Sequence, residues 1–151
     1  MHLLIPYVQL HNHHDPLLEE FTYGDVNARG IKLKTGLNKG EYVFFHTSKG
    51  GKKSITAYYV VDRVLDTAIA VNDQAIMAKY HSPHLEAYKT RRSSGLYDED
   101  VILFGDPILS RVLESPLPFS REISQKLSLN INFPIGLSDT QIIGSATRSW
   151  R

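Results

Sequence analysis

The segment Glu41–Leu65 reads EYVFFHTSKGGKKSITAYYVVDRVL, and it decides the fold. Both ends of this segment are rich in aromatic and β-branched residues, which is the composition of buried strands. Two glycines flanked by lysines separate the ends and are typical of a turn. The pattern therefore predicts a β-hairpin in which Glu41–Ser48 pairs with Ser54–Leu65.

Successive side chains of a strand point to opposite faces of a sheet. This alternation divides the first strand into two sets, Tyr42, Phe44 and His46 on one face and Val43, Phe45 and Thr47 on the other. We expect one face to be core, whereas the other is a candidate platform on which a base stacks. Plain core or cross-strand pairing of the same rings is the commoner arrangement. Tyr58 and Tyr59 also point to opposite sides, so at least one lies away from the main core.

The segments around the hairpin add one strand before it and one after it. Residues 3–10 predict a first strand, which Pro6 places at an edge or a bulge. Residues 100–107 predict a short buried strand that ends in a turn. Residues 11–30 and 81–98 are polar, and we expect both to be loops.

Capping signals predict three short helices. The first covers residues 74–80, with Asn72 or Asp73 as its N-cap, and Pro83 ends it. The second begins at its cap Ser120 and continues through Ile123 and Leu127. The third covers residues 139 to about 146 and follows the capping box Ser138-Asp139-Thr140-Gln141. The sum is one mixed α+β domain over residues 1–151, a mainly antiparallel sheet curled into a small barrel with short helices around it.

Composition narrows the class of protein. The chain has no cysteine, which excludes disulfides, thiolate metal sites and cysteine nucleophiles and fits a reducing compartment. No basic region precedes the first apolar run and no eighteen apolar residues are consecutive, so we expect a cytoplasmic protein without a membrane segment. The net charge is +1, from 17 basic and 16 acidic residues, and gives no support to a broad DNA-coating surface.

A family resemblance enters at residues 40–48 and 55–61. GEYVFFHTS followed by ITAYYVV resembles the PUA-like superfamily, especially its EVE, YTH and ASCH branches. Those domains carry a Gly-Asp-x-Val-x-Phe-Tyr type of strand and a returning strand with a Gly-x-x-x-Val pattern. Glu41 stands here where Asp is commoner, and Ala57 or Tyr58 stands where Gly is expected.

A second resemblance covers most of residues 11–123. His14-Asp15-Pro16, then residues 21–25 (FTYGD) with Arg29, and later residues 104–107 (FGDP) are similar to the prokaryotic nucleotide-modification-associated small domains. The two resemblances imply a PUA-like barrel that binds nucleic acid or a nucleotide. Such domains accept a base, modified or not, in a pocket beside the barrel and stack it on aromatic rings.

The candidate ligand-binding residues come from two walls and a rim. One wall is the loop with Tyr23, Gly24, Asp25 and Arg29, where Gly24 permits close backbone approach and Arg29 suits a phosphate. The remaining candidates are the strand end Phe45, His46, Thr47 and Ser48, then Tyr58, and Arg91 and Arg92 at the rim. Asp25 also fits a purely structural Asx-turn, and the arginines fit a surface loop.

The alternative function is a small metal-dependent hydrolase or nucleotide-modifying enzyme. Its ligands would be His11, His13 and Asp15, joined in space by His46, His81 or His84. A solvated polar loop explains this cluster better, because nothing else in the sequence completes a known ligand spacing. No nucleophile elbow or phosphate-binding glycine loop is present, and the sequence implies no cofactor.

A third class is an interaction subunit of a larger complex. This hypothesis predicts an exposed apolar patch near the C-terminal helix and Trp150. The expected partners are therefore a nucleic acid or nucleotide first, and a protein second.

Overall fold

The computed structural model describes residues 2–7, 16–49, 52–129, 131, 133 and 135–146. Its strands form one six-stranded sheet in the order β1-β3-β4-β5-β2, with β6 also paired to β4. The strands are β1 Leu3–Pro6, β2 Thr22–Val26, β3 Tyr42–Lys49, β4 Lys52–Asp66, β5 Asp100–Gly105 and β6 Arg111–Pro118. The predicted hairpin is confirmed, because β3 and β4 pair antiparallel from Tyr42 opposite Val60 to Lys49 opposite Lys52.

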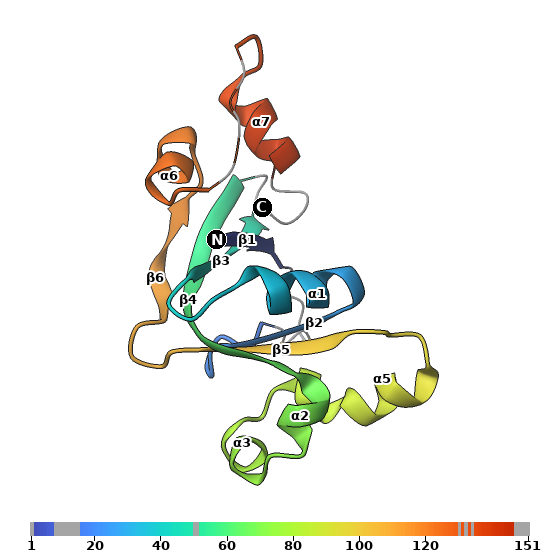
Figure 1. Ribbon diagram of the computed structural model, residues 1–151. Coiled ribbons are helices and arrows are strands. Elements are labelled where there is room, and N and C mark those ends of the chain that lie inside the picture. The colour runs from blue at the N-terminus through green and yellow to red at the C-terminus, as the bar shows by residue number, and fades with distance from the viewer. Residues whose placement is uncertain are drawn as a thin grey trace.

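β4 is the longest strand, with 15 residues, and its two halves pair with different strands. The first half pairs with β3 on one side and with β6 on the other, whereas residues 61–66 pair with β5. The register shifts between Val61 and Arg63, and a second shift opposite Phe45 and His46 lies at Thr56. Such irregularities bend a strand and increase its twist. β4 thus connects the hairpin to the β5–β2 pair (Figure 1).

Residue alternation sorts the buried side chains onto two faces of the hairpin. Phe45 and Tyr59 lie in the main core, together with Leu33 and the alternate residues of β1 and β5. Phe44 and Tyr58 lie on the other face, in a second apolar cluster with Phe119 and Leu129. The expectation that Tyr58 and Tyr59 point to opposite sides is confirmed. The rings of Phe44 and Tyr58 therefore lie on the face of the hairpin opposite the main core.

Seven helices surround the sheet within the described residues. They are α1 Asn27–Gly36, α2 Thr67–Val71, α3 Gln74–Lys79, α4 Pro83–Glu86, α5 Tyr88–Ser94, α6 Arg121–Lys126 and α7 Asp139–Ala146. α6 and α7 lie at one end of the molecule, and α2, α3 and α5 lie at the other (Figure 1). No helix of the described part of the chain is long and apolar enough to cross a membrane.

The three predicted helices are confirmed together with their caps. Asp73 accepts hydrogen bonds from the amides of Ala75 and Ile76 at the start of α3, and Ser120 accepts one from Ile123 at the start of α6. Ser138 and Gln141 form the reciprocal capping box of α7.

The predicted closed barrel is wrong. β1 and β2 are the two ends of the strand order, and no pairing joins them among the described residues, so the sheet stays open. β1 has four residues and ends at Pro6, which lacks an amide hydrogen. The mainly antiparallel arrangement is confirmed, since the pairing of β1 with β3 is the one parallel pair described. Of the predicted first strand 3–10, residues 8–10 lie outside the described residues.

Both predicted loops contain regular structure. Residues 22–36 form β2 and α1, and α1 is hard to detect because Val26 at its N-cap makes no side-chain cap and the helix contains two glycines. Within 81–98, Ser82 caps α4 and Gly95, with φ 68°, ends α5. The polar composition of α5 was misleading, because a helix with no buried residue has no apolar stripe.

Ser110 bonds the backbone of β4 beside the register shift between Val61 and Arg63, and its removal tests this contact. The amide of Val60 donates to Ser110 Oγ at 3.0 Å, and both groups are buried. Ser110→Ala leaves that amide without a partner, so we expect a loss of about 1–3 kcal/mol in unfolding free energy. Urea denaturation measures it, with Ser115→Ala, at an exposed position of β6, as the control. Equal stability of the two variants would contradict this role.

Candidate functional site

A pocket of about 350 Å³ lies on the hairpin face opposite the main core. Its walls come from the residue before β1, from β3, β4 and β6, and from the end of α6. The lining residues are His2, Tyr42, Phe44, Ile55, Tyr58, Leu113, Leu117, Lys126, Leu127 and Ser128. We call it the aromatic pocket. Its volume falls within the range of ordinary small-ligand sites.

Strand geometry brings the aromatic rings together. Tyr42 and Phe44 are two residues apart on β3 and share one face, and Tyr58 is the cross-strand partner of Phe44. The rings of Tyr42 and Phe44 are stacked, with 5.8 Å between their centroids and 12° between their planes. The Tyr58 ring lies 5.8 Å from that of Tyr42. The His2 ring meets Tyr42 edge-on at 5.4 Å, so four rings form one wall.

The polar groups of the aromatic pocket are few. Among the described residues that line it, Lys126 is the one with a charged side chain, and its ammonium pairs with Glu122 at 2.8 Å on the exposed surface of α6. His2 accepts a hydrogen bond at Nδ1 from the amide of Tyr42, at 3.1 Å. Burial lowers the pKa of His2 below 6.5. The pocket is therefore an apolar slot with hydrogen-bonding groups at a few points.

Among the residues predicted from sequence, Tyr58 lines the aromatic pocket. Tyr23 and Phe45 were predicted on opposite walls of a site, but both rings are buried in the main core, 5.5 Å apart. Tyr23 donates its hydroxyl to Asp25 Oδ2 at 2.6 Å, and Asp25 faces the exposed Arg29 at 4.0 Å. Thr47 and Ser48 follow on β3, half-buried and exposed, and do not line this pocket.

His46 is buried in an unusual way. Its side chain is 1% exposed, and neither ring nitrogen has a hydrogen-bond partner among the described residues. Burial, aided by the charge of Lys53, lowers the pKa of His46 to about 4. The ring is therefore neutral at physiological pH, and protonation would place an uncompensated charge inside the protein.

Asp100 is the centre of a buried polar network that sequence reasoning missed. Its carboxylate accepts hydrogen bonds from Thr67 Oγ1 at 2.7 Å and from Arg91 at 2.7 and 3.1 Å, and it lies 2.6 Å from His84 Nε2. Burial raises the pKa of Asp100, but the bonds to His84, Arg91 and Thr67 outweigh it and bring the pKa to about 2. Arg91, which was predicted at the rim of the ligand site, instead bonds Asp100 in this network.

Gly24 has a packing role in the same region. A Cβ at this position would lie 2.0 Å from the His84 ring, so only glycine lets the ring pack against β2. The sequence contained no local signal for this contact, because residues 24, 84 and 100 belong to three separate segments.

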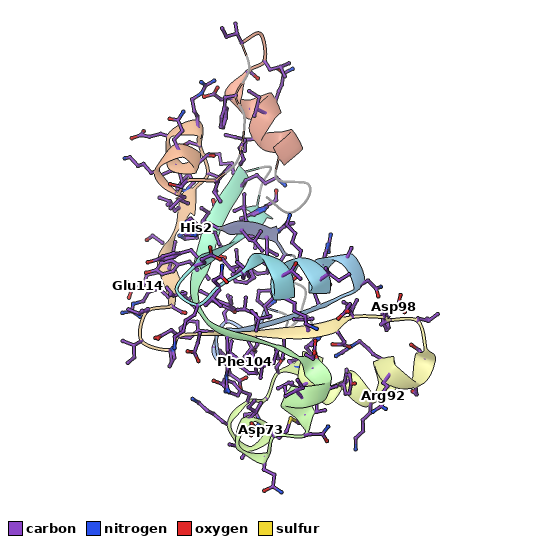
Figure 2. The ribbon with its side chains drawn as sticks, viewed as in Figure 1. His2, Asp73, Arg92, Asp98, Phe104 and Glu114 are labelled. Atoms are coloured by element: carbon purple, nitrogen blue, oxygen red, sulfur yellow. The ribbon has the colours of Figure 1, made fainter. Side chains whose placement is uncertain are left out.

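Arg92 lines a second pocket of about 330 Å³, beside α5. The other lining residues are Lys34, Asp66, Ala68, Tyr88, Tyr97, Asp98, Glu99 and Asp100. Figure 2 shows Arg92 and Asp98 near α5, well apart from His2 in the aromatic pocket. Lys34 Nζ pairs with Asp66 at 2.9 Å and reaches Glu99 at 3.9 Å. Carboxylates outnumber cations here, which disfavours a phosphate.

The structure describes no metal centre. Within residues 2–7, 16–49, 52–129 and the later described positions, no three His, Asp or Glu side chains are placed to hold a metal ion. His11, His13 and Asp15 lie outside the described residues, as does Trp150. The metal-dependent hydrolase stays a prediction, as does the apolar patch near Trp150.

Comparison with known proteins returns two solved structures. One is a crystal structure of ASCH from Zymomonas mobilis, with a TM-score of 0.40 and 12% identity, covering 97% of this chain and 95% of that chain. The other is a single-residue mutant of that protein, with a TM-score of 0.39, 12% identity and 97% and 98% coverage. ASCH is one of the branches that the sequence resembles. At such TM-scores the likeness supports neither a site nor a function, and no family model and no curated protein matches the chain.

The Asp100 network predicts a large effect of one isosteric change. Asp100→Asn removes the charge that neutralises Arg91, whose side chain is 17% exposed. Because breaking a buried pair leaves one charge uncompensated, we expect a loss of about 3 kcal/mol in unfolding free energy. Urea denaturation at neutral pH measures the loss. Asp98→Asn, at an exposed carboxylate, is the matched control and should change stability little.

His46 predicts a specific acid sensitivity. Its folded-state pKa of about 4 lies below the unfolded value of 6.5, so its contribution is complete above the unfolded pKa and decreases as the pH falls between the two values. Between about pH 7.5 and about pH 5 the expected loss in unfolding free energy is about 2 kcal/mol. His46→Leu should lack this part of the pH dependence. An identical pH profile for both proteins would show that His46 is not the cause.

Proposed function

We propose that the chain is a binding module that holds one nucleobase, modified or not, in the aromatic pocket. The base belongs to a free nucleotide or to a single strand of nucleic acid. The supporting observation is the wall of stacked rings, Tyr42 on Phe44 with Tyr58 beside them, in a pocket of about 350 Å³.

The chemistry of the wall suits a flat heteroaromatic ligand. Stacking of a base on an aromatic side chain contributes about 1–3 kcal/mol per base and tolerates any base, because every base has a π face. The apolar residues Ile55, Leu113 and Leu117 also line the slot and offer apolar contacts to a bound base. Single-stranded segments offer bases that can be splayed out into such a slot.

The charge distribution favours one base over a long contact with the phosphate backbone. The net charge is +1, and Lys126 is the one cation among the described residues that line the pocket. A protein that neutralises few phosphates releases few counterions, so its affinity depends only weakly on salt. The proposal therefore places most of the binding free energy in stacking.

The same proposal covers the whole of residues 1–151 as one PUA-like domain. The assignment of Tyr23, Gly24, Asp25 and Arg29 to a ligand site remains a prediction, because these residues do not line the aromatic pocket. Tyr58 is the residue common to the sequence-based set and to the pocket.

Replacement of one wall residue tests the proposal. Tyr42 is 37% exposed, so Tyr42→Leu should fold while removing the stacking surface. We expect the wild-type protein to bind nucleoside 5′-monophosphates with a Kd below about 1 mM, and the variant to bind about 5- to 150-fold more weakly. Isothermal titration calorimetry measures both.

Tyr97 supplies a matched control, because it is a tyrosine of similar exposure, 42%, in the second pocket. Tyr97→Leu should bind like the wild-type protein. Absence of binding by the wild-type protein in the millimolar range would overturn the proposal, as would equal weakening in the two variants.

A further inference from the structure

In the aromatic pocket, the fold determines which ring nitrogen of His2 accepts a hydrogen bond and which one donates. Its ring lines the pocket and packs edge-on against Tyr42 at 5.4 Å and against Phe44 at 6.3 Å. Nδ1 accepts from the backbone amide of Tyr42 at 3.1 Å. The amide belongs to the first residue of β3, so the sheet itself sets the orientation of the ring.

The bond to Tyr42 also fixes the tautomer. Only an unprotonated ring nitrogen accepts a hydrogen bond, and a neutral imidazole then carries its hydrogen on the other nitrogen. Burial lowers the pKa of His2, which favours the neutral ring. Nε2–H is therefore the polar group that His2 offers, and it makes no hydrogen bond to the described residues.

None of the other polar side chains described in the pocket is restricted to accepting hydrogen bonds. The hydroxyls of Tyr42, Tyr58 and Ser128 rotate, and each serves as donor or acceptor according to its partner. Lys126 can only donate, and its side chain is 66% exposed and paired with Glu122. Among the lining side chains that the structure describes, those with a fixed sense, His2 and Lys126, are thus donors, and a backbone amide holds His2 in place.

We propose that His2 recognises the edge of the bound base and selects a carbonyl oxygen over an exocyclic amine. This inference rests on the proposed function. Bases with a carbonyl at the recognised edge are uracil, thymine and guanine, whereas cytosine and adenine carry an amino group at the corresponding position. A carbonyl accepts from Nε2–H, but an amino group would place donor against donor and leave both without a partner.

Paired nucleotides provide the test, because each pair differs in the group at one edge. We compare uridine with cytidine 5′-monophosphate, and guanosine with adenosine 5′-monophosphate, by calorimetry. From the net free energy of one hydrogen bond, we expect the wild-type protein to bind the carbonyl member of each pair about 2- to 12-fold more tightly.

Two variants and one control assign the preference to His2. His2→Phe keeps a flat ring but has no donor, and His2→Gln has both a donor and an acceptor that its rotation can exchange. Both should bind the two members of each pair equally, with stacking retained. His81→Phe changes an exposed histidine outside the aromatic pocket and should keep the wild-type preference.

The results separate this inference from the proposed function. Binding without preference, preference for the amino bases, or a preference that survives in both His2 variants would overturn the role of His2 and leave base binding intact. Failure of all four nucleotides to bind the wild-type protein would overturn both.

Discussion

The rest of the structure depends on one long strand, β4, which pairs with two different sets of strands. The first half of β4 pairs with β3 and β6, and its second half pairs with β5. Because side chains alternate along a strand, the same hairpin fills the main core with Phe45 and Tyr59 and turns Phe44 and Tyr58 to the opposite face. The aromatic pocket is a direct consequence of this division.

The two ends of the molecule differ in how they use polar groups. Around Asp100, Thr67, His84 and Arg91 converge on one largely buried carboxylate, which fits a structural role better than ligand exchange. In the aromatic pocket, polar groups are sparse and most of the lining is apolar or aromatic, as in ordinary small-ligand sites. Arg91 and Arg92, two of the three predicted arginines, belong to α5, which lies at the end of the molecule opposite α6 (Figure 1).

Sequence reasoning succeeded where local chemistry determines structure. Strand propensity and the glycine turn predicted the hairpin, and Asp73, Ser120 and Ser138 predicted their helices, because a cap depends on residues three positions apart. It failed where long-range packing decides. The His84 ring against Gly24 gives no local signal, and a bulge at Thr56 alters alternation in a way that no pattern shows. Tyr58 was predicted for the site, whereas His2 and Lys126 are brought to it only by tertiary structure.

The central claim is that the aromatic pocket, and not the second pocket, holds a base. Two-dimensional NMR of the labelled protein during titration with uridine 5′-monophosphate tests this most directly. The account predicts the largest shift changes at Tyr42, Phe44 and Tyr58, caused by the ring current of the stacked base. Changes confined to Tyr88, Arg92 and Tyr97, or no change at millimolar ligand, would contradict it.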